Sequence, residues 1–455
     1  MNKILSNIES WEMAMVKPGH EGHNVVILES FCDGWDLSSL IDLAREDSDI
    51  VGGPFGSNLK VSDYRTSGIP IIRLQNIDRN KFINKNIKYI SQEKANELRY
   101  HSFRAGDVVL AKLGDPIGKT CMIPDYLREG IVTADIVRIR TIPEKTHKEF
   151  IVYALNSNFC LEQFCKHKTG TTRPRVNVSD VRNLKILLPP LPEQQRIAYV
   201  LSTVQEARDK TQAVIEAARE MKKSLMKHLF TYGPVPLAEA SKVPLKDTEI
   251  GMVPEGWNVA MLGDSAKIVS GGTPSRKNPE YWNGDIPWVK TGEVNYRSIT
   301  KTEEKISKKG LEESSTRIIP SGSLLMAMYG EGVTRGRVSI LGIDAAINQA
   351  CAAIFPFNNL YTYFLFYLFS INYEQIRNLG FGANQKNLSA TLIKTIKIPI
   401  PPLPEQQQIA DILVSVDKNI EANENKKKAL DTIFQTLLQN LMTGKIRVNH
   451  QVMLQ

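Results

Sequence analysis

The sequence has 455 residues, 42% of them hydrophobic and 23% charged, which excludes a single compact core and is typical of a globular protein with several domains. A formal net charge of +8 and a pI near 9.0 favour a polyanionic partner. The first residues lack the apolar core of a signal peptide, and the longest apolar run, at 360–371, is too short to span a bilayer, so we expect a cytoplasmic protein.

Residues 1–30 have no counterpart later in the chain, and we expect an N-terminal extension there. An internal repeat begins after them, because Gly34-Trp-Asp-Leu returns as Gly256-Trp-Asn-Val. Each copy continues with a glycine-rich turn, Gly52-Gly-Pro against Gly271-Gly-Thr, and then with a short apolar strand that has a polar end, at 69–77 and 286–294. The order of these segments is the same in both copies, which predicts two related units.

The middle of each unit predicts a strand that ends in a glycine turn, at 107–114 and 323–330. An aromatic-rich helix is expected next, at 150–164 and 361–376. A basic loop follows each helix: residues 166–185 hold six Lys or Arg and one acid, and residues 375–397 hold four Lys or Arg and no acid. Glycine and polar donors are interleaved in both loops, which suits contact with a phosphate backbone and with base edges.

Each unit ends in the motif Pro-Pro-Leu-Pro-Glu-Gln-Gln, at 189–195 and 401–407. Pro192 and Pro404 suit the first helical position, and Glu193 and Glu405 complement the positive end of a helix dipole, so a helix is predicted to begin at each motif. Apolar residues then recur at steps of three and four over a stretch that corresponds to a helix about 58 Å long, at about 1.5 Å per residue.

The two long helices carry apolar stripes of equal length, which favours pairing with each other over packing on separate domains. Thr211 and Asn423 occupy equivalent places in the two stripes, where they predict either a polar layer that sets the register or a local gap in the pairing. The residues predicted to form the seam are Ile197, Leu201, Val204, Ile215, Leu225, Leu229, Ile409, Leu413, Val416, Ile420, Leu430, Phe434, Leu437 and Leu441.

The segment between the two copies contains four prolines and little periodicity, which is typical of a linker. The predicted divisions are an extension over 1–30, a first domain over 31–188, a first long helix over 189–232, a linker over 233–255, a second domain over 256–400, a second long helix over 401–443 and a tail over 444–455.

Motifs of catalysis are absent from the sequence. Gly114-Asp-Pro-Ile-Gly-Lys-Thr120 approaches a phosphate-binding loop, but it has three residues between its glycines where the motif needs four. Neither Pro-Pro site has the acidic or amide residue and the aromatic of an adenine methyltransferase loop. Cys160, Cys165 and His167 could be imagined as metal ligands, but no fourth ligand accompanies them, and buried thiols are expected instead. We therefore predict no catalytic residue, no metal and no cofactor.

The doubled Pro-Pro-Leu-Pro-Glu-Gln-Gln helix, the Gly-Trp opening of each unit and the entry sequence at 246–257 resemble the specificity (S) subunit of type I restriction-modification systems, over about residues 30–445. The resemblance implies an α+β fold with two target recognition domains, each followed by a long helix, and the two helices paired as an antiparallel coiled coil. It also implies a non-catalytic subunit that reads a bipartite, asymmetric sequence in double-stranded DNA. Two methyltransferase (M) subunits would dock on it, and restriction (R) subunits would join through them.

Candidate DNA-binding residues come from the polar strand ends, the glycine turns and the basic loops. Arg and Lys tend to pair with guanine, and Asn and Gln with adenine, but the sequence does not assign contacts to bases. Two alternatives stay open: an enzyme with a degenerate nucleotide-binding loop, and a coiled-coil scaffold without DNA readout. The candidates are Lys60, Arg73, Lys119, Thr171, Thr172, Arg173, Arg175, Lys290, Arg335, Arg337, Asn384, Gln385 and Lys386.

Overall fold

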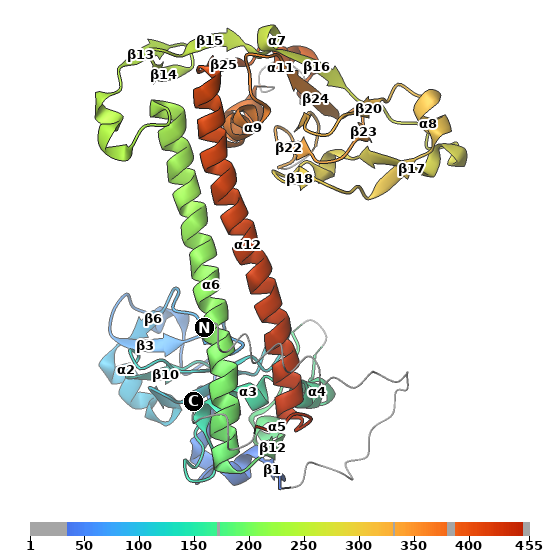
Figure 1. The fold of residues 1–455 in the computed structure, drawn as a ribbon. Helices are drawn as coiled ribbons and strands as arrows, with labels where there is room; N and C mark the ends of the chain where they lie inside the picture. Colours follow the sequence, from blue (N-terminus) through green and yellow to red (C-terminus); the bar gives the residue numbers. More distant parts are fainter. Residues whose placement is uncertain (1–33, 171–172, 331–332, 380–386, 449–455) are drawn as a thin grey trace. The chain divides into compact units, whose positions relative to one another are not determined.

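The computed structural model describes residues 34–170, 173–330, 333–379 and 387–448. The chain divides into two compact units. Unit 1 comprises the described residues up to Glu206 together with those from Asp431 onwards, and unit 2 comprises Ala207–Leu430. Each unit contains a mixed α/β domain and one end of each of two long helices, α6 (Leu191–Tyr232) and α12 (Leu403–Met442) (Figure 1). The α+β fold class predicted from the sequence is confirmed.

The domain of unit 1 is built on two four-stranded sheets, with strand orders β6-β3-β10-β7 and β2-β11-β8-β9. Strands β3 and β10 run parallel, whereas the other neighbours in these sheets are antiparallel. The strands are β2 (Ile50–Gly52), β3 (Ile69–Ile72), β6 (Lys88–Ile90), β7 (Ser102–Arg104), β8 (Val108–Ala111), β9 (Thr120–Met122), β10 (Glu129–Val132) and β11 (Ile136–Ile139), with a small hairpin of β4 (Ile77–Asp78) and β5 (Lys81–Phe82). The short helices are α2 (Gln92–Glu97), α3 (Lys148–Leu155), α4 (Asn158–His167) and α5 (Val178–Arg182).

The domain of unit 2 repeats this plan, with a five-stranded sheet in the order β16-β24-β21-β22-β18 and a four-stranded sheet in the order β19-β17-β23-β20. Strands β17 and β23 run parallel, as β3 and β10 do in unit 1. The strands are β16 (Ala266–Ser270), β17 (Trp282–Val289), β18 (Ser298–Ile299), β19 (Glu304–Ile306), β20 (Ile318–Ile319), β21 (Leu324–Ala327), β22 (Val338–Leu341), β23 (Ala345–Ile347) and β24 (Cys351–Pro356). The helices are α7 (Leu262–Ser265), α8 (Lys308–Glu312), α9 (Thr362–Ile371), α10 (Tyr373–Asn378) and α11 (Ala390–Lys394).

The first and last strands of each domain lie side by side. In unit 1, β1 (Asp36–Ser39) pairs antiparallel with β12 (Lys185–Leu188), and in unit 2, β15 (Asn258–Met261) pairs antiparallel with β25 (Lys397–Ile400). The Gly-Trp opening of each domain is thereby brought next to the Pro-Pro-Leu-Pro-Glu-Gln-Gln motif that closes it.

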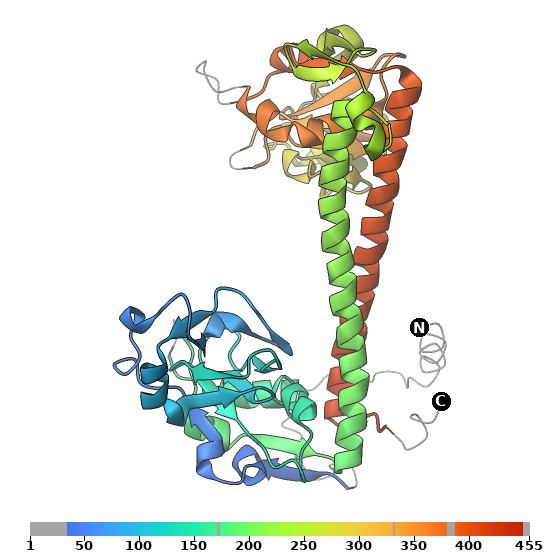
Figure 2. The ribbon, with the colours of Figure 1, turned by 90° about the vertical axis from the view of Figure 1, so that its left-hand side faces the viewer.

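The two long helices pack against each other in both units, and they run antiparallel (Figures 1 and 2). In unit 1 the start of α6 meets the end of α12, because Ile197 and Leu201 share a hydrophobic core with Phe434 and Leu441. In unit 2 the end of α6 meets the start of α12, and there the shared core includes Met226, Leu229, Ile409 and Leu413. Each helix ends at a glycine of positive φ, Gly233 (φ 80°) or Gly444 (φ 67°), which is a common helix stop.

Ten of the predicted seam residues are buried: Ile197, Leu201, Ile215, Leu229, Ile409, Leu413, Val416, Ile420, Phe434 and Leu441. The other four, Val204, Leu225, Leu430 and Leu437, are half-buried. Met226 and Leu438 are more buried than the predicted Leu225 and Leu437 beside them. A straight helix drifts by about 20° per heptad from a repeat of 3.5 residues per turn, so the buried stripe moves on by one residue towards a helix end. Thr211 and Asn423 donate to carbonyls of their own helices, those of Ala207 and Asn419.

Several local expectations were wrong. The aromatic segments at 150–164 and 361–376 are not single helices, because each is divided into two, α3 and α4 or α9 and α10. The sequence comparison paired Gly52 with Gly271, but Gly53 is the equivalent of Gly271 in the structure. A side chain at Gly53 would collide with the carbonyl of Thr133, and one at Gly271 would collide with the carbonyl of Ile347. The segment 233–255 holds a 3₁₀ helix at Leu237–Lys242 and a hairpin of β13 (Leu245–Thr248) and β14 (Gly251–Pro254). In the described part of the chain, no helix has the length and apolarity needed to cross a membrane.

Candidate nucleic-acid interface

The repeated motif attaches each domain to its long helix through a buried tryptophan. Trp35 donates its indole N–H to a carboxylate oxygen of Glu193 at 3.2 Å, and Trp257 donates in the same way to Glu405 at 2.9 Å. In unit 1, Arg447 also pairs with Glu193, with 2.7 Å between Nε and Oε1. The tryptophan that opens each domain is therefore fastened to the first turn of the helix that follows the domain.

The first glutamine of each motif is fully buried and satisfies three backbone groups. Gln406 donates to the carbonyls of Asn359 and Pro401, at 3.0 and 2.8 Å, and accepts the amide N–H of Tyr361 at 2.9 Å. Gln194 makes the equivalent three contacts in unit 1. The second glutamine of each motif is exposed. The motif thus holds the start of α3 or α9 close to the start of the long helix, and it orients the domain from which the basic loop projects.

In unit 1 a pocket of about 370 Å³ opens where the parallel strands β3 and β10 end. Arg73 follows β3, and its Nη2 donates to the carbonyl of Asn86 at 2.6 Å. Gln75 also lines the pocket, as do Tyr64 and Asp135. Lys60 is exposed, next to the lining residue Leu59. Donors and acceptors of several kinds are therefore presented at one edge, which suits the reading of base edges.

The basic loop of unit 1 returns to the other sheet of the domain, which contains β8. Arg175 forms a bridge with Leu113, just after β8, and Arg173 is exposed. Lys112, which follows β8, is half-buried. Burial lowers the pKa of the Lys112 ammonium; the charge of Asp135 opposes this shift and the charge of Arg175 adds to it. The charges of Arg175 and of the pocket residue Asp135 therefore both act on Lys112. Lys112 was not predicted as a site residue, because the sequence does not distinguish it from a solvent-exposed lysine that follows a buried strand.

Lys119 lies on the other turn of this sheet, where its Nζ is 3.0 Å from a carboxylate oxygen of Asp78. The stretch Gly114–Thr120 joins the antiparallel strands β8 and β9 and leads into a strand, not a helix. A phosphate-binding loop needs a helix N-terminus directly after its lysine. The nucleotide-binding alternative is therefore contradicted by the fold of this segment.

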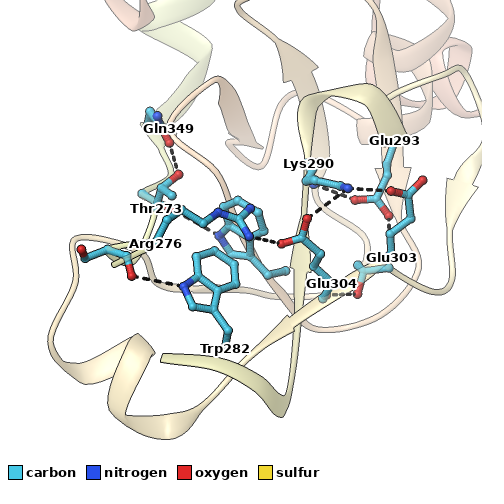
Figure 3. Close-up of polar contacts among 12 residues, drawn as sticks. Thr273, Arg276, Trp282, Lys290, Glu293, Glu303, Glu304 and Gln349 are labelled. Atoms are coloured by element: carbon cyan, nitrogen blue, oxygen red, sulfur yellow. Dashed lines mark hydrogen bonds and ion pairs between the residues drawn. The ribbon is translucent and has the colours of Figure 1, made fainter. Parts of the chain in front are cut away.

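In unit 2 the same place in the fold, at the ends of β17 and β23, is occupied by a cluster of charged and aromatic side chains (Figure 3). Lys290 follows β17, as Arg73 follows β3, and its Nζ lies 2.6 Å from Glu303 and 3.1 Å from Glu304. These hydrogen bonds, first that of Glu303 and then that of Glu304, raise the pKa of Lys290. Arg276 pairs with Glu304 at 2.6 Å. The positive charge of Lys290 is thus neutralised within the domain.

Of the remaining DNA-binding candidates predicted in unit 2, the structure describes Arg335 and Arg337. Arg335 is buried, and Arg337 is half-buried with its guanidinium carbon 5.8 Å from the ring centroid of Tyr296. Arg337 is the equivalent of Lys119, because the carbonyl oxygen of each accepts the amide N–H of the alanine that ends the preceding strand, Ala327 in β21 or Ala111 in β8. The predicted residues that lie outside the described part of the chain are Thr171, Thr172, Asn384, Gln385 and Lys386.

The cysteines give a direct test of the metal-ligand alternative. Cys160 is buried in the core of unit 1, whereas Cys165 is exposed. Burial raises the pKa of Cys121, Cys160 and Cys351 to about 12.

In a Cys32→Ser background near pH 8, we expect a maleimide to label Cys165 in the native protein and the other three only after denaturation, as followed by mass spectrometry. Labelling of native Cys160 as fast as Cys165 would contradict this arrangement.

Comparison with known proteins identifies the repeated domain. The family model described as "Type I restriction modification DNA specificity domain" matches residues 56–217 and 254–432, once in each repeat. The putative type I restriction enzyme MjaX specificity subunit of Methanocaldococcus jannaschii is 27% identical over 391 residues, which cover 84% of this chain and 88% of that protein. The HindI specificity subunit of Haemophilus influenzae is 21% identical over 442 residues, covering 83% of this chain and 94% of that protein.

A solved structure has the same fold. The crystal structure of the type I restriction-modification S subunit from M. genitalium superposes with a TM-score of 0.59 at 16% identity, covering 90% of this chain and 96% of that one. The family model covers more than half of the chain and both of its repeats. This chain therefore belongs to the family of type I restriction-modification DNA specificity subunits.

Proposed function

We propose that this chain is the sequence-recognition subunit of a type I restriction-modification complex, and that it reads a bipartite, asymmetric sequence in double-stranded DNA. Its target recognition domains would be residues 31–188 and 256–400. The observation that carries the proposal is the contrast between the two units at one place in the fold. The ends of β3 and β10 present Arg73 and a pocket, whereas the ends of β17 and β23 present Arg276 and Lys290. Two readers of one plan with different side chains suit two unlike half-sites.

The long helices would serve as the spacer between the two half-sites and as the docking surface for two methyltransferase subunits, with restriction subunits joining through these. Their antiparallel pairing supports a spacer role, because a rigid pair of helices can fix the distance between half-sites as dimer geometry does in simpler DNA-binding proteins. The chain itself would carry out no catalysis. In each unit the glutamate of the repeated motif, Glu193 or Glu405, accepts the indole N–H of the tryptophan that opens the domain. This repeated contact supports a structural role for the motif.

An exchange of one domain tests the proposal. A hybrid in which residues 34–188 come from a related specificity subunit should direct methylation to a sequence with only one half changed, because each domain reads its own half-site. The modified sequences can be determined by sequencing host DNA in which the hybrid and the methyltransferase are expressed. A change in both halves, or in neither, would contradict the two-reader proposal.

The scaffold alternative gives a different result in a binding assay. If the helices were the functional part and the basic loops were only solvated surface, the assembled complex would not bind its modified sequence more tightly than random duplex. The proposed function instead predicts specific binding that weakens steeply with salt, because Lys and Arg displace counterions from phosphates.

A further inference from the structure

Unit 2 holds one arginine in a defined plane. The guanidinium carbon of Arg276 lies 3.6 Å from the ring centroid of Trp282 and 5.2 Å from that of Trp288. The two indoles meet edge to face, with centroids 5.1 Å apart. Arg276 also donates from Nη1 to Glu304 at 2.6 Å, and Figure 3 shows its side chain lying against Trp282 and directed towards Glu304. Stacking and hydrogen bonding together restrict the rotamers of a side chain that is otherwise very flexible.

The surrounding backbone is braced around this arginine. Trp282 donates its indole N–H to the carbonyl of Ser275 at 3.2 Å, and Trp288 donates to the carbonyl of Gly272 at 3.1 Å. Thr273 donates to the side chain of Gln349, which follows β23. The loop that carries Arg276 is therefore tied both to its own aromatic residues and to the neighbouring strand end. Such supporting contacts are what a preorganised binding side chain requires.

The charges of the cluster favour a base edge over a phosphate. The hydrogen bond from Arg276 is the main cause that lowers the pKa of Glu304, so this carboxylate stays ionised. Lys290 is already engaged by Glu303 and Glu304. With two cations facing two carboxylates, the cluster has no surplus positive charge to attract a phosphate. Arginine beside a carboxylate does match the major-groove edge of a G·C pair, whose guanine accepts and whose cytosine donates.

The position of Arg276 in the fold points the same way. The cluster lies at the ends of the parallel strands β17 and β23, and the equivalent place in unit 1 is the pocket that Arg73 and Gln75 line. The Arg276 side chain is 54% exposed, so its outer donors can be reached. Among the described contacts, Glu304 engages Nη1 of a group that has five N–H donors.

We propose that Arg276 is a specificity-determining residue that reads a guanine in the DNA half-site of unit 2. Trp282, Glu304 and Lys290 are positioning residues that hold its guanidinium in plane, which gives Lys290 a supporting role in place of the direct DNA contact predicted from the sequence. This inference rests on the proposed function, because it assumes that unit 2 reads DNA.

The test uses the full chain assembled with its own methyltransferase. Arg276→Gln removes the charge and the planar guanidinium fork, and Lys267→Ala is a control that removes an exposed charge from β16 of the same unit. Sequencing of host DNA should show that one position in one half of the modified sequence no longer requires guanine with Arg276→Gln, while the other half is unchanged. Lys267→Ala should leave the whole sequence unchanged.

Binding of the purified complex to duplexes varied at single positions gives the magnitude. Preference for guanine over adenine at the affected position should fall by about 5- to 150-fold, the discrimination of one bidentate contact. The inference would be overturned by an unchanged sequence or by a change in both halves. A uniform loss of affinity with a salt slope reduced by about 1 would also overturn it, because that result indicates a phosphate contact. A lowered melting temperature with unaltered preference would also overturn it. Failure of the wild-type complex to show any bipartite sequence would instead count against the proposed function.

Discussion

Replacement of Leu413 by aspartate is expected to destabilise unit 2 by at least about 4 kcal/mol, because the side chain is fully buried between α6 and the domain. The substitution removes an apolar side chain from a core that also contains Met226 and Leu229, and it places a carboxylate where the surroundings offer no water. Scanning calorimetry of the purified chain measures this as a transition at much lower temperature. Docking of methyltransferase should be lost with it.

A matched control lies two residues further along the same helix. Ser415 is exposed on α12, so Ser415→Asp introduces the same charge without burying it and should change stability by less than about 1 kcal/mol. Equal melting temperatures for Leu413→Asp and Ser415→Asp would show that this face of α12 is not packed against α6.

The long helices were predictable because their signals are local and repeated. Pro192 and Pro404 stand one residue after the observed starts of α6 and α12, and the apolar stripe fits a period that tertiary contacts do not override. The precise burial at the helix ends was not predictable. There Met226 and Leu438 are more buried than the predicted residues beside them, because the drift of a straight helix adds to the packing of the domains on these turns.

Some local elements were not predicted. The hairpin of β13 and β14 lies in a proline-rich stretch, and proline content alone suggested a linker. The breaks between α3 and α4 and between α9 and α10 occur at Asn156 and Asn372, whose side chains donate to carbonyls of the preceding turn. Apolar periodicity did not indicate those breaks, because buried apolar residues stand on both sides of each, such as Phe150 and Phe164, or Phe364 and Ile376.

The candidate DNA contacts were predicted only in part. Arg73 and Lys290 were named from their place after apolar strands, and the structure puts them at equivalent strand ends. Arg276 was missed, because its importance lies in Trp282 and Trp288, which the sequence separates from it by several residues. The sequence does contain a signal, because Arg276 lies between the glycine turn at 271–272 and the two tryptophans.

Replacement of Gln406 by alanine is expected to cost about 3 to 5 kcal/mol of stability in unit 2. The carbonyls of Asn359 and Pro401 and the amide of Tyr361 would lose a partner that is itself fully buried, and each loss costs about 1 to 3 kcal/mol where water cannot substitute fully. Gln407→Ala changes the neighbouring, exposed glutamine of the same motif and should lie within about 0.5 kcal/mol of wild type. Chemical denaturation of the two variants measures the difference.

The variant Gln406→Glu separates the hydrogen bonds from the packing, because it keeps the size of the side chain. An ionised carboxylate cannot donate to the two carbonyls, so the folded state would favour the protonated form and the pKa of the new group would rise above its ordinary value of about 4.3. The unfolded chain then binds fewer protons than the folded one above that pH, and stability should fall as the pH rises from about 4 to 7. A stability difference from wild type that is the same at both ends of this range would show that Gln406 fills space without holding the backbone of Asn359 and Pro401.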